Sequence, residues 1–571
     1  MSSSSAAVNS QSPSLKTYFK TPEGRYKLQY EKTHPAAVLH YSHGKAVSQL
    51  TIAYLKERPT TQASATPSIP SSGGVRSAAA RLLGAGNGSR ALSFVGGNGV
   101  SRPVSGSSRI GGSAGASTGS GSSQPVANFD EKGTYLIFNS ADTLFISDLN
   151  SQDKDPIKSI HFSNSNPVCH AFDSEVKGGH DLLIGLHSGD VYSVSLRQQL
   201  QDPGRKLVAA HHYNKDGSIN NRHVWLTGPQ LKCSTIVTDY ILILRCTCIA
   251  WVPEGDGTFV VGHADGNIYV YERNKDGTAD CLFPAIKDQT QFAVAHARSP
   301  RSNPIARWHI YQGSINSLSF SSDGTCLATV GRDGYLRVFD FAKDQLKFGG
   351  RSYYGALLCC AWSSDGKYIL TGGEDDLVQV WSTEDRKIVA CGEGHNSWVS
   401  GVAFDSYWSA PNSDGTGENV VYRFGSVGQD TQLLLWDLAM DEIVVPLRCG
   451  PPGGSPTFNS GSPAAHWDSV CVVGSLQPSP SIRDVPKISP LVAHRAHVDP
   501  LSELIFTNES VVTISREGHI KIWMRPRHSE SNESSSSEAV VPTASVKDRP
   551  TTSSIKNSSL SYKQPSSVLF S

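Results

Sequence analysis

Acidic and aromatic side chains recur in this chain at one fixed spacing. Five times, an acid in a turn-forming stretch stands six residues before an aromatic residue. The acids are Asp265, Asp333, Asp375, Asp430 and Glu517, and the aromatic partners are Tyr271, Phe339, Trp381, Trp436 and Trp523. A carboxylate in a turn can accept hydrogen bonds from the backbone amides of that same turn. The spacing therefore indicates carboxylates that hold turns together, not carboxylates that catalyse a reaction.

One copy of the pattern has a larger set of polar side chains around it. A histidine precedes the turn, and a serine lies four residues before the turn acid. Such donors and acceptors can satisfy one another inside a protein. We therefore expect a buried hydrogen-bonded set with a structural role, made of His395, Ser426, Asp430 and Trp436. A structural role is also expected for Asp265, Asp333, Asp375, Trp381 and Trp523.

Motifs that carry catalysis in other proteins are not found in the chain. There is no HExxH metal-binding motif and no Walker phosphate-binding loop. The glycines Gly84, Gly86 and Gly88 stand in a low-complexity run, not between a strand and a helix. We predict that the protein is not an enzyme and has no catalytic residues, metal site, cofactor or small-molecule substrate.

Strands are the elements that must position the acids and the aromatic residues. Between each acid and its aromatic partner, residues that face one side of a strand alternate with residues that face the other, as Leu336 and Val338 do with Arg337. Another strand is expected upstream of four copies, and clusters such as SSDG supply the turns. These upstream strands are expected at 248–253, 318–324, 359–366 and 401–405. A turn followed by a half-buried strand, repeated, indicates a β-propeller. We predict an all-β, seven-bladed WD40 β-propeller with long disordered insertions and tails.

Two of the seven blades are inferred from weaker patterns. Residues 134–149 supply two strands of the first blade, and its opening strand is expected within 46–55. Residues 191–196 close the second blade, and the five strands that end in aromatic residues close the third to the seventh. Residues 25–30 alternate cleanly between two faces. We expect this N-terminal strand to pair with the last blade and close the ring, which removes two free strand edges.

Composition divides the chain into ordered and disordered parts. Residues 60–128 are mostly Ser, Gly, Ala and Thr, with five arginines and no lysine or acid, too few apolar groups to form a core. Their arginines suit either a docking or phosphorylation motif or a tolerated basic loop. We expect a disordered N-terminus over 1–20, the start of the propeller over 21–56, a disordered insertion over 60–128, the main propeller over 129–527 and a disordered Ser-rich tail over 528–571.

Two further segments interrupt the propeller. Residues 448–490 are rich in Pro, Gly and Ser and are expected to separate blades six and seven. Residues 222–244 are apolar without a strand or helix period. Their removal would join a loop directly to the first strand of blade three. They are either an optional insertion or a buried strand of an irregular blade.

Charge and cysteine content narrow the class of protein. The chain has 51 basic and 51 acidic residues, and this balance argues against a nucleic-acid surface. Its N-terminus lacks the apolar core of a secretory signal, and residues 236–252 are too short and too charged to span a membrane. The 11 cysteines are scattered and are expected to be reduced thiols. Cys246 and Cys248 lack a second ligand pair for zinc. We expect a cytoplasmic or nuclear protein, or one found in both.

Longer stretches of the chain resemble one family of WD-repeat proteins. The resemblance rests on EGRYKL at 23–28, YNKDG at 213–217, the run 352–405, YRFGSVGQDTQLLLWDL at 422–438 and REGHIKIW at 516–523. This family comprises regulatory subunits of ubiquitin-specific proteases and includes the fungal carbon-catabolite-repression protein creC. The resemblance implies a non-catalytic scaffold that binds and activates a ubiquitin-specific protease. It also implies that a second WD-repeat protein can take part.

Loops that lead into the inner strands of a propeller meet at one rim of its channel. Aromatic residues there that serve neither a turn nor a core are candidate hot spots for binding. Tyr354 and Trp398 precede the inner strands of consecutive blades. By resemblance, their two loops would form the protease-binding surface. The predicted partner-binding residues are Tyr353, Tyr354, Asn396, Ser397 and Trp398.

Acidic residues stand in the turn of the same region. Glu374 and Asp376 could add an acidic rim, whereas we expect Asp375 to be used by its own turn. We expect no membrane or nucleic acid among the partners.

Two other functions are compatible with a propeller. A substrate receptor of a cullin-based ubiquitin ligase would have the opposite effect on ubiquitin. Such receptors often carry Trp-Asp-x-Arg at the end of a blade, and WDLA at 436–439, FDFA at 339–342 and WMRP at 523–526 do not fit that motif. A general protein-interaction scaffold is the remaining alternative.

Overall fold

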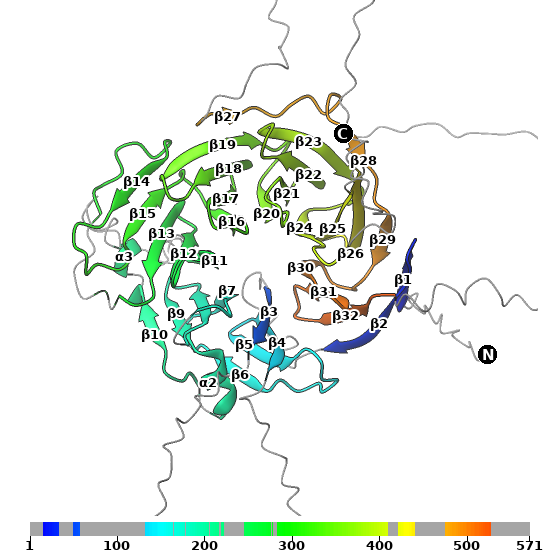
Figure 1. Cartoon of the computed structure of the whole chain (residues 1–571), viewed down its shortest axis with the longest axis horizontal. Helices are drawn as coiled ribbons and strands as arrows, with labels where there is room; N and C mark the ends of the chain where they lie inside the picture. The colour runs from blue at the N-terminus through cyan, green and yellow to red at the C-terminus, as the bar shows by residue number, and fades with distance from the viewer. Residues whose placement is uncertain are drawn as a thin grey trace, which may run out of the picture.

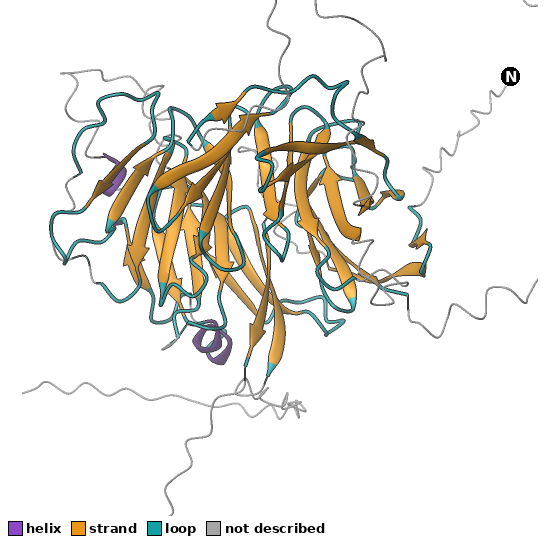
Figure 2. Ribbon diagram, turned by 45° about the horizontal axis from the view of Figure 1, so that its top comes forward, coloured by secondary structure: helices purple, strands orange, loops and turns teal. Residues whose placement is uncertain are grey.

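The computed structural model describes residues 15–32, 49–56, 132–163, 165–176, 179–204, 206–215, 218–221, 245–275, 277, 283–408, 421–439 and 474–526. These residues form seven β-sheets arranged as blades around a central axis (Figure 1). Figure 2 shows the strands side by side, with loops at both ends of the ring. The predicted all-β, seven-bladed propeller is confirmed. In the part of the chain that the structure describes, no helix is long and apolar enough to cross a membrane.

The first three blades contain the strands inferred from weaker patterns. Blade one consists of β3 (Leu50–Leu55), β4 (Gly133–Ser140), β5 (Thr143–Asp148) and β6 (Lys158–His161). Blade two consists of β7 (Pro167–Phe172), β8 (Leu182–Leu186), β9 (Val191–Val194) and β10 (His211–Tyr213). Blade three consists of β11 (Cys246–Trp251), β12 (Thr258–His263), β13 (Asn267–Glu272), β15 (Ala306–His309) and β14 (Ala293–His296). Two short helices, α2 (Leu196–Gln201) and α3 (Ser218–Asn221), stand in the connections around β10.

The last four blades follow the repeated pattern most closely. Blade four consists of β16 (Ile315–Phe320), β17 (Cys326–Gly331), β18 (Tyr335–Asp340), β19 (Gln345–Arg351) and β27 (Leu476–Gln477). Blade five consists of β20 (Leu357–Trp362), β21 (Tyr368–Gly373), β22 (Leu377–Ser382), β23 (Lys387–Glu393) and β28 (Lys487–Ile488). Blade six consists of β24 (Val399–Phe404), β25 (Val421–Gly428), β26 (Gln432–Ala439) and β29 (Val492–Arg495). Blade seven consists of β30 (Leu501–Phe506), β31 (Ser510–Ser515), β32 (Ile520–Met524), β2 (Gly24–Lys32) and β1 (Tyr18–Thr21).

The inner strands share one local irregularity. In blades two to seven, the pairing of the inner strand with the second strand shifts register at its first residues. In blade one, β3 and β4 pair without a shift. A β-bulge bends a strand and increases its twist. The repeated bulge therefore helps the described sheets to twist alike at the channel.

The two ends of the chain meet in blade seven. Strand β2 pairs antiparallel with β32, with Leu28 opposite Trp523. Tyr26 is buried and stacks on Phe19 of β1, with 4.7 Å between ring centroids. The predicted closure of the ring by an N-terminal strand is confirmed. One boundary was wrong, because β1 begins at Tyr18 and so includes residues 18–20 of the expected disordered N-terminus, and the apolar Phe19 side chain packs into the blade.

The Pro/Gly/Ser-rich insertion does not separate blades six and seven. It lies within blade six, because β29 after it is the outer strand of that blade. Before β29, the chain follows the outside of blades four and five (Figure 1). There β27 pairs parallel with β19, and β28 pairs parallel with β23. Residues 474–490 of the insertion are therefore ordered, since they cover two strand edges that would otherwise stay unpaired.

Neighbouring blades pack where an aromatic ring meets a glycine. A side chain at Gly350 of β19 would come within 2.7 Å of the Trp381 ring in the next blade. Gly392 of β23 stands against the Trp436 ring in the same way, at 2.9 Å. The repeated six-residue spacing between the turn acid and the aromatic residue thus also places the aromatic ring against the fourth strand of the preceding blade.

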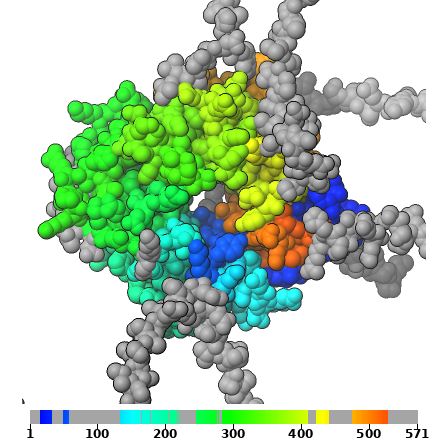
Figure 3. Space-filling model, viewed as in Figure 1, coloured from blue at the N-terminus to red at the C-terminus, as the bar shows by residue number. Residues whose placement is uncertain are grey.

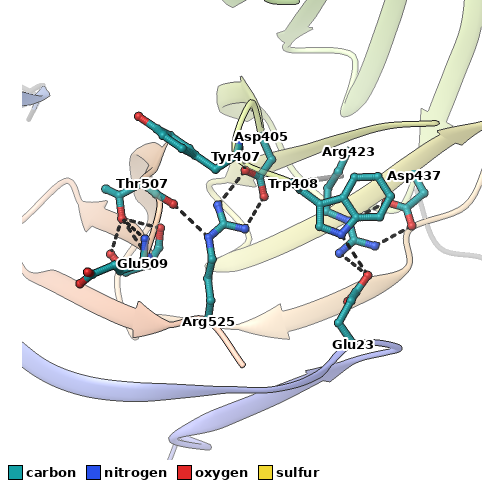
Figure 4. Close-up of polar contacts among 10 residues, drawn as sticks. Glu23, Asp405, Tyr407, Trp408, Arg423, Asp437, Thr507, Glu509 and Arg525 are labelled. Carbon is teal, nitrogen blue, oxygen red and sulfur yellow. Dashed lines mark hydrogen bonds and ion pairs between the residues drawn. The ribbon is translucent and has the colours of Figure 1, made fainter. Parts of the chain in front are cut away.

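Salt bridges join blades six and seven at the edge of the ring (Figure 4). Arg525, which follows β32, forms two 2.7 Å bonds to the carboxylate of Asp405, which follows β24. Arg423 of β25 pairs with Asp437 of its own blade and with Glu23 in the turn between β1 and β2. The guanidinium of Arg423 also lies 4.0 Å from the Trp408 ring centroid. These contacts fasten the N-terminal hairpin to blade six.

Several sequence-based expectations fall outside the described residues. They are the insertion 60–128, the apolar segment 222–244, the N-terminal residues 1–14 and the tail 528–571. Among the described cysteines, Cys246, Cys248, Cys359 and Cys360 lie in inner strands as expected and are free thiols. Burial raises the pKa of the Cys248 and Cys360 thiols to about 12.

Candidate functional site

One face of the ring carries the turns with the repeated acids and the loops that lead into the inner strands. The start of each inner strand pairs with the end of the second strand, as Leu357 does with Gly373 and Val399 with Gly428. The loop before the inner strand and the turn after the second strand therefore lie together. We call this side of the propeller the turn face. The space-filling view shows the ring hollowed at its axis (Figure 3).

The predicted polar set of blade six forms as expected. His395 Nδ1 lies 3.0 Å from a carboxylate oxygen of Asp430, and His395 Nε2 lies 2.8 Å from Ser426 Oγ. The Trp436 indole donates to Ser426 Oγ at 2.8 Å. Since the indole can only donate, the Ser426 hydroxyl can donate to Nε2, which leaves the Nδ1 proton for Asp430. All four side chains are satisfied by one another.

Acid, histidine and serine in this order resemble the parts of a nucleophilic catalyst, but the arrangement does not suit that role. Ser426 is fully buried, and its oxygen already accepts the indole proton of Trp436. A nucleophile must be reachable by its substrate. The geometry therefore supports the structural role predicted for these residues.

The same set also orients the loop above it. The Asn396 backbone amide donates to Asp430 at 3.0 Å, and the carbonyl of Trp398 accepts the Gln429 amide at 2.9 Å. Burial alone would raise the pKa of Asp430, but hydrogen bonds from His395 and the Asn396 amide outweigh it and lower the pKa below its ordinary value. An ionised Asp430 thus holds the loop that presents Trp398.

Blade five has tyrosine where blade six has histidine. Tyr353 and His395 each stand four residues before their inner strand. Tyr353 packs against the core of its blade. The sequence predicted that Tyr353 binds a partner. In the structure its side chain instead occupies the position that His395 has in blade six. Among the described residues no cation pairs with Asp375, and burial raises its pKa to about 6 against hydrogen bonds that include the one from the Leu377 amide.

The other predicted turn acids perform their structural role. Asp265 accepts the Asn267 amide at 2.9 Å, and Asp333 accepts the Tyr335 amide at 3.2 Å. As expected, Asp375 accepts hydrogen bonds within its own turn, and it also accepts one from the Gln379 side chain at 2.6 Å. The remaining aromatic anchors donate inward: Trp381 donates to Thr371 at 2.9 Å, and Trp523 donates to Thr513 at 3.1 Å.

Two aromatic side chains project from the turn face, as the sequence predicted. Tyr354 is 74% exposed and Trp398 is 38% exposed. They stand in the corresponding loops of the adjacent blades five and six, whose inner strands contact one another. Asn396 is exposed and Ser397 is partly exposed beside Trp398. Large apolar groups that a rigid scaffold exposes are typical anchors for a protein partner.

The sequence predicted Glu374 only as part of an acidic rim. Its carboxylate accepts the Ala356 amide at 3.0 Å and so holds the loop of Tyr354 in place. The sequence pattern did not indicate one further exposed residue of this surface. Val498 in the loop of blade seven is 66% exposed. It stands three residues before β30, where blade five has Tyr354 three residues before β20. This equivalent position, three residues before an inner strand, is the feature of the sequence that could have identified Val498.

The fold and this surface define a WD-repeat β-propeller that acts as a protein-interaction scaffold. A model of the WD domain, G-beta repeat, matches residues 303–340 and 348–382. Each match spans all or part of the fourth strand of one blade and the first three strands of the next.

Over 326 residues the chain is 35% identical to WD repeat-containing protein 20 of Mus musculus. The match covers 50% of this chain and 52% of that protein, so the chain spans about half the length of this relative. In solved structures, the chain is similar to one from the "Crystal Structure of Mitotic Checkpoint Complex", with a TM-score of 0.39 and 14% identity. That similarity covers 68% of this chain and 84% of the other.

Proposed function

We propose that this protein is a non-catalytic subunit that binds and activates a ubiquitin-specific protease through its turn face. The observation that supports it most is the pair of exposed aromatic side chains, Tyr354 and Trp398, on loops whose backbone amides are hydrogen-bonded to Glu374 and Asp430. The family resemblance of the sequence implies the class of partner. The similarity to WD repeat-containing protein 20 is consistent with membership of the same family.

Activation requires more than binding. A scaffold raises the activity of an enzyme only if it binds the active conformation more tightly than the inactive one. A preformed surface suits this purpose, because little entropy is lost when it docks. The Asp430 and Glu374 hydrogen bonds fix the two loops before any partner arrives. The proposed mechanism is therefore a shift of the protease toward its productive arrangement.

Substitution of the exposed aromatics tests the proposal. Trp398→Ala and Tyr354→Ala are each expected to weaken protease binding by about 2 kcal/mol, or roughly thirtyfold, the scale of an interface hot spot. Neither side chain is part of a core cluster, so the melting temperature should stay the same. Binding is measured with purified chain and a panel of ubiquitin-specific proteases, together with cleavage of a ubiquitin substrate.

Tyr407→Ala is the matched control. Tyr407 is 47% exposed and lies in the turn after β24, at the end of the strand opposite the turn face. Its substitution should leave binding and activation intact. If the folded Trp398 and Tyr354 variants bind like wild type, the turn face is not the docking surface. If the chain instead captures a cullin adaptor, the protein acts in ubiquitin ligation.

A further inference from the structure

Three basic side chains stand on consecutive blades of the turn face. His187 follows β8 of blade two, Arg245 precedes β11 of blade three, and Arg332 follows β17 of blade four. These strand ends are equivalent, since in each blade the first residue of the inner strand pairs with the end of the second strand. All three positions belong to the two innermost strands of their sheets, so the cationic cluster lies at the mouth of the channel.

The cationic cluster has no counter-charge. Among the described residues, the side chains of His187, Arg245 and Arg332 form no ion pair or hydrogen bond, and Arg245 Nε is buried without a partner. Two other arginines of this fold that are largely buried are paired with carboxylates, Arg423 with Asp437 and Arg525 with Asp405. Arg245 and His187 are partly buried, whereas Arg332 is exposed. Partial removal of a charged group from water without a partner is costly, and this cost falls mainly on Arg245.

The turn acids of these three blades cannot supply the missing charge. Asp190 of blade two is bonded to His212 at 2.7 Å and to Ser188. Asp265 of blade three is bonded to both the backbone and the side chain of Asn267. Asp333 of blade four forms a 2.6 Å ion pair with Arg337. Each carboxylate is already held by its own blade.

The members of the cluster also repel one another. Burial lowers the pKa of Arg245, and the charge of Arg332 lowers this pKa further. Burial likewise lowers the pKa of His187 below 6.5, with a further contribution from Arg245. At neutral pH the His187 imidazole is therefore mostly uncharged and can offer an N–H donor, while the two arginines carry the positive charge. The equivalent strand ends of three consecutive blades place these groups side by side on the turn face, in accord with this repulsion. An anion in that space would relieve both the burial cost and the repulsion.

We propose that His187, Arg245 and Arg332 bind an anionic side chain, a carboxylate or a phosphate group, on an acidic peptide segment of a protein partner. Arginine binds both groups through paired, charge-assisted hydrogen bonds. A peptide fits better than a nucleic acid, because the cations occupy one spot and the chain has no net charge. The site lies on blades two to four, apart from Tyr354 and Trp398 on blades five and six, and does not depend on the proposed function.

Peptide binding by the full chain tests the proposal. The probes are fluorescein-labelled octaglutamate, a peptide with four phosphoserines, uncharged octaglutamine and a single-stranded RNA, measured by fluorescence anisotropy at near-physiological salt. Wild type should bind one or both anionic peptides and not octaglutamine. Arg245→Gln and Arg332→Gln should each weaken that binding about tenfold, the effect of one charge-assisted hydrogen bond.

Arg298→Gln is the matched control, since Arg298 is exposed on the outer part of blade three. It should not change peptide binding. The melting temperature of Arg245→Gln should stay level or rise, because the change removes an unpaired buried charge, and the more exposed Arg332 provides a second variant that cannot disturb the core. A loss of binding with unchanged stability separates a ligand site from a structural role.

The outcomes are distinct. Binding of octaglutamate supports a carboxylate ligand, and binding of the phosphopeptide alone supports a phosphate ligand. The proposal is wrong if neither peptide binds, if Arg298→Gln weakens binding as much as the cluster variants do, or if the RNA binds more tightly than both peptides. The assay contains no protease, so its failure leaves the proposed function unaffected.

Discussion

At the residue scale, blades five and six differ in the residue four positions before the inner strand and in the charge environment of the turn acid. In blade six this position is His395, which pairs with Asp430. In blade five it is Tyr353, and Asp375 has hydrogen-bond donors but no cation. The two carboxyl groups therefore have pKa values that are displaced in opposite directions, Asp430 downward and Asp375 upward.

These opposite displacements predict opposite pH effects. The pKa of Asp430 is lowered in the folded state, so its stabilising contribution is present at neutral pH and is lost as pH falls through the folded pKa. Asp430→Asn should cost about 3 kcal/mol at pH 7, as for a broken buried pair, and less in acid. The pKa of Asp375 is raised to about 6, so ionisation destabilises the fold as pH rises from 3.8 through 6.

Relative to wild type, Asp375→Asn should therefore become more stable as pH rises from 4 to 7, whereas Asp430→Asn should become less stable over the same range. Thermal melting of the three proteins at several pH values measures both trends. Parallel trends in the two variants would contradict the assignment of charge states.

At the element scale, the Arg525–Asp405 salt bridge connects the ends of a strand of blade seven and a strand of blade six. The Asp405 side chain is fully buried, and Arg525 is 13% exposed. Arg525→Met should lower the free energy of unfolding by about 3 kcal/mol, because it leaves a buried carboxylate without a partner. The double variant Arg525→Met, Asp405→Leu should recover most of this loss. Chemical denaturation of both single variants and the double variant gives the coupling energy, and strictly additive losses would show that the pair is not coupled.

Individual strands also show what the sequence can reveal. Strand β2 was predictable, because its alternation places Tyr26 toward the core and Arg25 toward solvent. Strands β27 and β28 were not, since two residues that pair only through their backbones leave no side-chain pattern. Residues 18–20 were predicted to be disordered because a polar stretch precedes them, although Phe19 supplies the anchor of β1.

The residues of the candidate surface also differ in whether the sequence could predict them. Tyr354 and Trp398 were predictable, because each is a large aromatic residue in a loop whose turn already has its acid. Tyr353 was assigned to the binding surface because the sequence alone cannot show that it replaces a histidine inside the blade. The cationic cluster was not predictable, since its members are 58 and 87 residues apart and meet only through the ring. Pairings within a repeat leave a signal in sequence, whereas pairings between repeats do not.

At the scale of the whole molecule, the ring must close where its two ends meet. Blade seven is completed by β2, and its inner strand β30 contacts β3, the first strand of blade one. At this seam the Leu50 amide donates to Glu503 at 2.6 Å. Each blade of such a repeat fold is stabilised mainly by its neighbours. The seam between blades seven and one therefore affects the stability of the entire ring.

Glu503 makes the stability of this seam sensitive to pH. Burial raises its pKa to about 8, despite the hydrogen bond from Leu50 that favours the ionised form. The folded pKa of this acid lies above its ordinary value of 4.5, so the fold loses stability as pH rises from 4.5 through 8. Glu503→Gln keeps an acceptor for the Leu50 amide and removes the charge. The variant should match wild type below pH 4.5 and exceed its stability by about 2 kcal/mol at pH 9, less than the full shift implies because the side chain is partly exposed. Thermal melting across this range checks the prediction, with the exposed Glu509→Gln as the control. A stability difference that is constant with pH would mean that Glu503 contributes through packing, and that charge plays no part in closing the ring.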